Sequence, residues 1–156
     1  MKTINLCENT DFPNKIGKGT RILGIDPGKK NIGISISDPS QKIATPLKII
    51  FMKKFKKFIE DLNRVIMDYE IKGIVVGNPI NMDGSIGPRS QSAKDFAQNI
   101  SKMTNLPITL WDERLSSDGA FSLMDELDIN SSKKTKKLDQ HAAAFILQGY
   151  LDFLNK

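Results

Sequence analysis

Hydrophobic residues in this chain change their spacing in a definite order, and that order restricts the fold more than any other feature. They form a short run within 21–26 that ends on an acid, alternate with polar residues in 32–37, and favour a strand again within 42–50. Alternation with period two is typical of a half-buried strand. From Phe51 to Tyr69 they recur every three or four residues, which predicts an amphipathic helix. The chain therefore begins as a small sheet and then changes to a pattern that includes helices.

The rest of the chain alternates strand-like and helix-like patterns. We expect strands in 73–77 and 107–111, and helices near 90–103, 120–127 and 138–153. Three strands in succession, followed by alternating helices and strands, predict an α/β fold with a five-stranded mixed sheet flanked by helices. Residues 1–20 show no periodicity, so we expect them to be a flexible lead-in to a domain that spans 21–156.

Length, cysteine use and charge limit the class of protein. The chain has 156 residues, enough for one domain at roughly 150 residues each. No stretch approaches the roughly 18 apolar residues of a membrane span, and the N-terminus lacks the apolar segment of a secretory signal. With Cys7 as the single cysteine, we expect a cytoplasmic protein that does not contact a membrane. The formal net charge of +5 favours a polyanionic partner such as nucleic acid.

Three acids stand at the ends of expected elements. Asp26 ends the first strand, Glu113 follows the last strand, and Asp139 begins the last helix. Ligand sites in open α/β sheets gather at the carboxyl ends of strands, which places Asp26 and Glu113 at one edge. Each acid alone also has an ordinary structural interpretation as a turn cap, a surface ion-pair partner or a helix N-terminal charge. Their joint placement favours a functional site.

A cluster of carboxylates needs a cation to offset its repulsion. Magnesium prefers oxygen ligands and is often held by one or two carboxylates together with substrate phosphates. On a basic protein, such a cluster indicates metal-dependent cleavage of a phosphodiester, with Mg²⁺ or Mn²⁺ as the cofactor.

Four motifs, in order, resemble those of one known family. They are Gly24–Asp38, Ile74–Ser85 with Gly87-Pro88-Arg89, Asp112–Ser116, and Leu138-Asp139 with Ala142-Ala143 and Ile146-Leu147-Gln148. They resemble the YqgF family, the Holliday-junction-resolvase-like branch of the ribonuclease H superfamily. The resemblance extends from about residue 21 to 152. It implies a ribonuclease H-like fold and a nuclease that trims the precursor of 16S ribosomal RNA, with the ribosome precursor as its partner.

The resemblance also implies roles for the three acids. Asp26, Glu113 and Asp139 match the family's catalytic, metal-binding carboxylates. True resolvases carry an acid at the end of strand four, where this chain has Gly77-Asn78-Pro79. The second ligand must then come from strand five. Asp112 and Glu113 alternate there, so only one of them faces the site, and the motif favours Glu113.

Several other polar residues are candidates for substrate contact. A guanidinium can bind phosphate through two hydrogen bonds, which favours Arg114 beside the candidate acid. Lys30 lies near Asp26, and Asn81 and Arg89 lie in or beside the loop after strand four. A further lysine group flanks Asp139 and is expected to guide the substrate strand: Lys133, Lys134, Lys136 and Lys137. We interpret the lysines of 53–57 as a solvated helix face, the aromatic residues among them as core, and His141 as a packing or surface residue.

Three functions are compatible with these residues. The first is a magnesium-dependent endonuclease that acts on structured RNA. The second is a Holliday junction resolvase that acts on branched DNA, and the third is a nucleic-acid-binding protein on the same fold that no longer cleaves. The sequence leaves the oligomeric state and the number of metal ions open. A fragment of an actin-like ATPase is disfavoured, because those enzymes bind nucleotide between two such domains.

Overall fold

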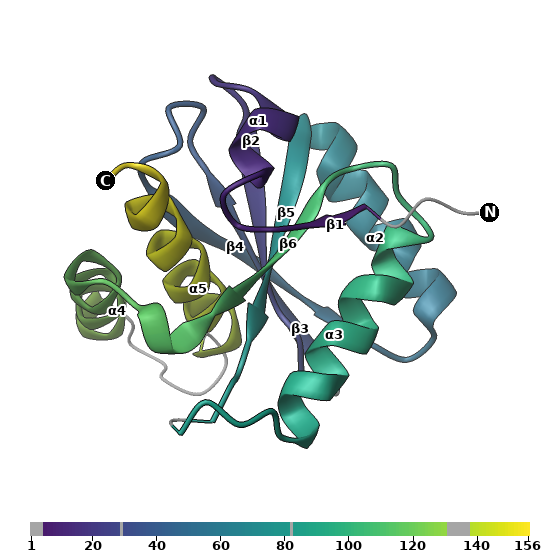
Figure 1. Cartoon of the computed structure of the whole chain (residues 1–156). Helices are drawn as coiled ribbons and strands as arrows, with labels where there is room; N and C mark the ends of the chain where they lie inside the picture. The colour runs from purple at the N-terminus through teal and green to yellow at the C-terminus, as the bar shows by residue number, and fades with distance from the viewer. Residues whose placement is uncertain (1–4, 29, 82, 131–137) are drawn as a thin grey trace.

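A mixed sheet forms the centre of the molecule (Figure 1). In this computed structural model, which describes residues 5–28, 30–81, 83–130 and 138–156, six strands are arranged in the order β1-β6-β5-β2-β3-β4. The strands are β1 (Leu6–Cys7), β2 (Arg21–Asp26), β3 (Asn31–Ser37), β4 (Ala44–Phe51), β5 (Ile71–Asn78) and β6 (Ile108–Asp112). The helical segments are α1 (Phe12–Ile16), α2 (Phe55–Asp68), α3 (Pro88–Ser101), the short 3-10 helix η1 (Glu113–Leu115), α4 (Asp118–Asn130) and α5 (Leu138–Leu154).

The strand directions bring several strand ends to one edge of the sheet. β5 pairs in parallel with β2 and with β6, whereas β3 is antiparallel to both β2 and β4. As a result β2, β4, β5 and β6 all end at the same edge, which we call the carboxyl edge; it lies at the bottom of Figure 1. The predicted class of fold is confirmed.

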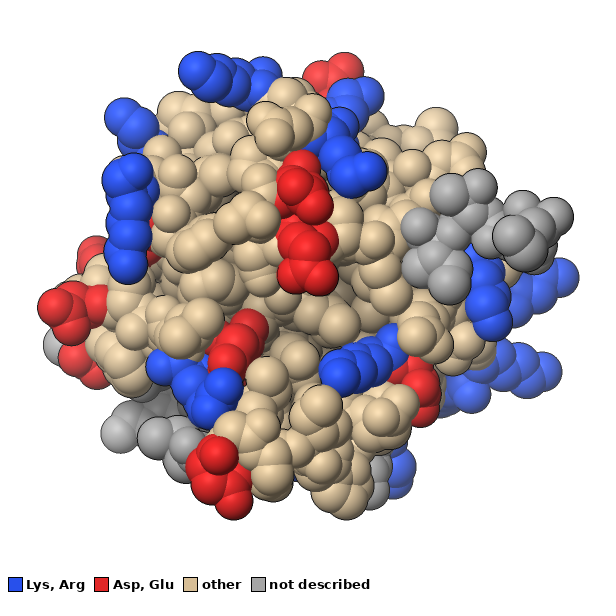
Figure 2. Space-filling view, in the orientation of Figure 1, with Lys and Arg blue, Asp and Glu red and all other residues tan. Residues whose placement is uncertain are grey.

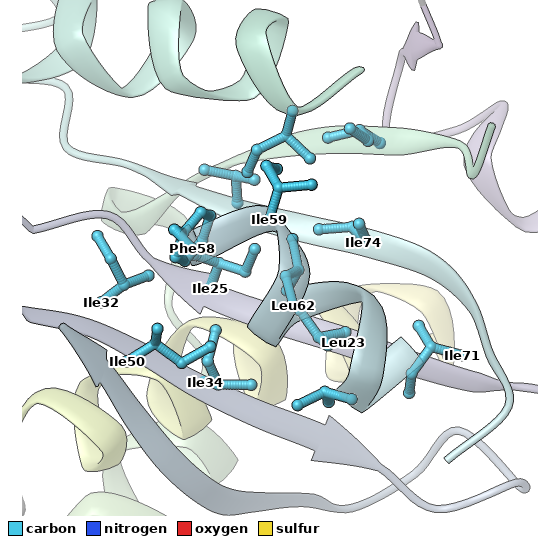
Figure 3. Close-up of a cluster of buried hydrophobic side chains, with 14 of the residues drawn as sticks. Leu23, Ile25, Ile32, Ile34, Ile50, Phe58, Ile59, Leu62, Ile71 and Ile74 are labelled. Atoms are coloured by element: carbon cyan, nitrogen blue, oxygen red, sulfur yellow. The ribbon is translucent and has the colours of Figure 1, made fainter. Parts of the chain in front are cut away.

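Helices cover both faces of the sheet. α2 and α3 cover one face, and α4 and α5 lie on the other (Figure 1). Leu23 and Ile25 of β2 point into a core shared with Phe58, Ile59 and Leu62 of α2 (Figure 3). Ile22, on the opposite face, joins a second core built largely from α5. Alternate residues of β2 are therefore buried on opposite faces, as expected for a strand with helices on both sides.

The expectation of a flexible lead-in is wrong for residues 5–20. Leu6 and Cys7 pair with β6, which adds a sixth strand to the five that were predicted. Phe12 is fully buried, and its ring meets that of Tyr150 edge to face at 5.5 Å. Phe12 and Ile16 form a single apolar pair four residues apart, too short a pattern to stand out, and the sheet supplies the rest of the contact.

The boundary between the third predicted strand and the following helix also differs. β4 extends to Phe51, because this residue pairs with Asn31 of β3, and the helix begins only at Phe55. Phe51 is 67% exposed, so it is not the core residue that its spacing indicated. Pro46 lies on this outer strand beside a shift in the β3–β4 register, and edge strands and bulges are the places where a sheet accepts proline.

The last two helices are confirmed, and α4 is longer than predicted. The lysines at 133, 134, 136 and 137, expected to guide the substrate strand, lie outside the described residues. Within the described part of the chain, no helix combines the length and the apolar character that crossing a membrane requires.

Candidate active site

Asp26 lies at the carboxyl edge, on the face of the sheet that α5 covers. It follows Gly24 by two residues, and a Cβ at Gly24 would lie 2.7 Å from the Cβ of Leu147 in α5. The glycine therefore allows the helix to pack directly on β2. The hydroxyl of Ser35 in β3 donates a hydrogen bond of 2.8 Å to the Ala143 carbonyl oxygen, which holds α5 in this position. The same alternation that places Gly24 under α5 directs Asp26 to that face.

Glu113 approaches Asp26 from the neighbouring strands. It follows β6 directly, and one of its carboxylate oxygens lies 3.1 Å from the point where Gly77 of β5 would carry a Cβ. Burial and, after it, the negative charge of Asp26 together raise the pKa of Glu113 to about 7, while Arg89 opposes the shift. The two carboxylates therefore share one electrostatic environment across the end of β5.

Asp112 is turned to a different partner. Its carboxylate accepts a 2.7 Å hydrogen bond from the Arg114 guanidinium and a 3.0 Å bond from the Arg114 backbone N–H. These bonds lower the pKa of Asp112. Of the two neighbouring acids, it is Glu113 and not Asp112 that the structure brings within electrostatic reach of Asp26.

The segment Gly77-Asn78-Pro79 lies at the end of β5, where true resolvases carry an acid, and each of its first two residues has a structural role beside Glu113. Gly77 leaves space for the Glu113 carboxylate, where a side chain would collide. Asn78 is buried, and its side-chain oxygen accepts a 2.6 Å hydrogen bond from the Ser90 hydroxyl of α3. This hydrogen bond ties the first turn of α3 to the end of β5. The N-terminal end of α3 is thereby fixed beside the acids.

Asp139 belongs to the first turn of α5, and its side chain lies outside the described residues. Ala143, one turn further along, has its carbonyl oxygen over Gly24, so α5 begins near the carboxyl edge. Among the side chains that the structure describes, no group of three or more His, Cys, Asp or Glu could hold a metal ion. The described part of the site therefore supplies two carboxylates, Asp26 and Glu113.

The predicted substrate residues differ in the groups that they contact. Arg89, in the first turn of α3, is exposed and acts electrostatically on Glu113. Arg114 forms its ion pair with Asp112. Lys30 is exposed, and its carbonyl oxygen accepts a hydrogen bond from the backbone N–H of Met52. Asn81 donates to the Ser85 hydroxyl at 2.9 Å and so shapes the loop after β5.

His141 is buried, in agreement with its interpretation as a packing residue.

Two features beside the acids were missed in the sequence. Phe51 lies exposed at the carboxyl edge, where β4 ends, and the exposed residues Lys53 and Lys54 follow it. Figure 2 shows basic side chains gathered on the right of the molecule, where α2 begins. The second feature is a cavity of about 530 Å³ lined by Pro27, Gly28, Pro79, Pro88, Arg89, Ser92 and Phe96. The aromatic spacing in the sequence was assigned wholly to the core, so neither feature was expected.

The fold and the position of the acids define the class of protein. The structure is similar to that of RuvC from T. thermophilus, solved in complex with a Holliday junction substrate, with a TM-score of 0.58 and 10% identity. The match covers 86% of this chain and 96% of that one. At this identity the likeness concerns the fold, which is the ribonuclease H-like fold of RuvC-type resolvases.

Comparison of sequences identifies the family. Residues 20–153 match the family model described as "RuvX: Holliday junction resolvase", and the chain belongs to this family. It is 54% identical over 145 residues to the "Putative pre-16S rRNA nuclease" of Pelagibacter ubique, covering 93% of this chain and 96% of the relative. A protein of the same name from Rhodobacter capsulatus is 45% identical over 144 residues, covering 92% and 91%. The resemblance to the YqgF family is confirmed.

Proposed function

We propose that this protein is a divalent-metal-dependent endonuclease that hydrolyses phosphodiester bonds in the maturation of the 5′ end of 16S ribosomal RNA. The observation that carries the proposal is the pairing of Asp26 with Glu113 across the end of β5. The names of the relatives support ribosomal RNA precursor as the substrate. Such a substrate assigns the protein to the cytoplasm.

The two carboxylates fit a magnesium ion. Their oxygens are hard ligands, and magnesium is commonly held by one or two carboxylates with phosphate and water completing its shell. The raised pKa of Glu113 shows that a second negative charge at this place is costly in the protein alone. Asp26 and Glu113, with Asp139 as the third carboxylate, would hold Mg²⁺ or Mn²⁺. A bound metal activates water and neutralises charge on the scissile phosphate.

The remaining residues of the site would bind and orient the RNA. Arg89 presents a guanidinium beside the acids, where it can hold a phosphate oxygen that does not react. Asn78 and Ser90 keep the helix that carries Arg89 in place. Farther along the carboxyl edge, Lys30 and the lysines at the start of α2 can hold phosphates of the flanking strand. This distribution separates groups that act on the cleaved bond from groups that hold the rest of the substrate.

A cleavage assay on two substrates tests the proposal. Purified protein is incubated with a 16S rRNA precursor and with a four-way DNA junction, each with Mg²⁺, with Mn²⁺ and with chelator. We expect cleavage of the RNA only in the presence of metal. Cleavage of the junction alone would favour a resolvase, and binding of either substrate without cleavage would favour a non-catalytic binding protein.

Variants of the acids link cleavage to the site. Asp26→Asn and Asp139→Asn are nearly isosteric and should lower the rate by orders of magnitude while RNA binding persists. The matched control is Asp61→Asn on α2, whose carboxylate pairs with Lys57. Equal rates for wild-type protein and Asp26→Asn would contradict the assignment.

A further inference from the structure

We propose that the cavity lined by Pro27, Arg89 and Phe96 binds one unpaired nucleobase of the RNA, next to the phosphate that is cleaved. This inference rests on the proposed function and adds a requirement to it: the substrate must be single-stranded beside the cut. Nothing in the acid pair itself demands this, because a phosphodiester is the same in single and double strands.

The walls of the cavity connect it directly to the acids. Pro27 and Gly28 follow Asp26 without a gap, and Pro79 follows the end of β5, over which the Glu113 carboxylate lies. The opposite wall is the first two turns of α3, from Pro88 to Phe96. A group in the cavity is therefore separated from the acid pair only by the ends of β2 and β5.

The chemistry of the walls suits a base. Its volume of about 530 Å³ lies within the roughly 300–1,000 Å³ typical of small-molecule sites. Three proline rings and the Phe96 ring offer apolar surface for the flat face of a base, and Ser92 adds a hydroxyl. The Phe96 ring packs against that of Phe58, with centroids 5.6 Å apart, so its orientation is supported from beneath.

The charge at the cavity argues for a base that is attached to phosphate. Arg89 lines the cavity and also acts electrostatically on Glu113, so the same cation can attract a phosphate attached to a base in the cavity. The lining contains no carboxylate among the described residues, and it therefore does not repel a polyanion. Only an unstacked nucleotide can insert its base into such a space, which is how proteins usually recognise single-stranded RNA.

Binding of RNA that lacks single bases tests the proposal. Affinity is measured in chelator, so that no cleavage occurs, for precursor RNAs with one abasic residue at each position around the cut. For wild-type protein we expect one adjacent position at which loss of the base weakens binding by roughly 5- to 100-fold, the usual effect of losing one stacked base. Phe96→Leu should weaken binding of intact RNA by a similar factor, and should lose all sensitivity to that abasic position.

Control variants separate the cavity from general effects on folding. Phe121→Leu removes a 55% exposed ring from α4, on the other face of the sheet, and should leave the abasic profile unchanged. Ser92→Phe fills the cavity from an exposed helix position and should reproduce the effect of Phe96→Leu, even if the latter variant folds poorly.

The outcomes distinguish this inference from the proposed function. If wild-type protein binds every abasic RNA as tightly as intact RNA, the cavity is not a base site, while metal-dependent cleavage would still uphold the nuclease. If one abasic position weakens binding but no RNA is cleaved, the base site stands and the catalytic function fails. If Phe96→Leu and Ser92→Phe keep the wild-type profile, the base is held elsewhere and the inference is overturned.

Discussion

Replacing Glu113 with glutamine should stabilise the metal-free protein at high pH. The pKa of Glu113 is raised from 4.5 to about 7, mainly by burial and then by the charge of Asp26. A carboxyl group with a raised pKa favours the folded state while it is protonated, and this contribution is lost as the pH rises from about 4.5 through 7. Glutamine has no charge to bury, so the variant does not undergo this loss.

The size of the effect follows from the shift. Each pKa unit corresponds to about 1.36 kcal/mol, and between pH 5 and pH 8 the shift amounts to roughly 2.5 kcal/mol. Solvent reaches part of the Glu113 side chain, which reduces the expected change to about 2 kcal/mol. For a domain of this size, that difference raises the melting temperature of the variant over wild type by roughly 4–8 °C.

Urea unfolding in chelator at pH 5 and pH 8 measures the effect. The free energy of unfolding of Glu113→Gln minus that of wild type should grow by about 2 kcal/mol between the two pH values. Adding millimolar Mg²⁺ at pH 8 should then stabilise wild type and leave the variant almost unchanged, because a ligand stabilises only the state that binds it.

The neighbouring acid provides the control. Asp112 forms an ion pair with Arg114, so Asp112→Asn should lower stability at pH 8 by at most about 1 kcal/mol, the opposite direction. If the difference between Glu113→Gln and wild type is the same at pH 5 and pH 8, the pKa of Glu113 is not raised in the folded protein by burial and the charge of Asp26. The proposed metal site would then lose its main support.

Three further predictions concern the fold and the substrate path. The double variant Lys53→Gln, Lys54→Gln should weaken RNA binding, and a plot of the logarithm of the binding constant against the logarithm of salt concentration should become less steep by roughly 1 to 2 units. An unchanged slope would show that these lysines are solvated surface residues that do not contact RNA. Gly24→Ala should lower the free energy of unfolding by about 1–3 kcal/mol in urea denaturation, because its methyl group overlaps Leu147; wild-type stability would show that α5 can shift away. Phe12→Ala should lower the free energy of unfolding by about 3–5 kcal/mol in the same assay, because Phe12 is fully buried. A change near zero would support the flexible lead-in that the sequence predicted for residues 1–20.

Local patterns were sufficient for most of the elements. The alternation in 32–37 and the helical spacing after Phe55 predicted β3 and α2. Each segment spans several repeats of its pattern, two residues for a strand and about 3.6 for a helix, so the pattern can be recognised from the sequence. The short elements at the start of the chain were missed for the converse reason. A two-residue strand and a five-residue helix contain no repeat, and they are stabilised by contacts with β6 and with Tyr150.

The sequence by itself determined the class of fold, the family and the identity of the candidate acids, since periodicity and motif spacing are carried by neighbouring residues. Only the tertiary structure decided which of the acids at 112 and 113 lies near Asp26. Alternation along a strand shows that the two side chains point to opposite faces, but not which face α5 covers. It also decided that Phe51 is exposed and that Phe96 lines a cavity. The helical spacing of an aromatic residue is the same whether its ring is buried or exposed. The exposure of the ring is determined by packing between segments that are distant in the chain.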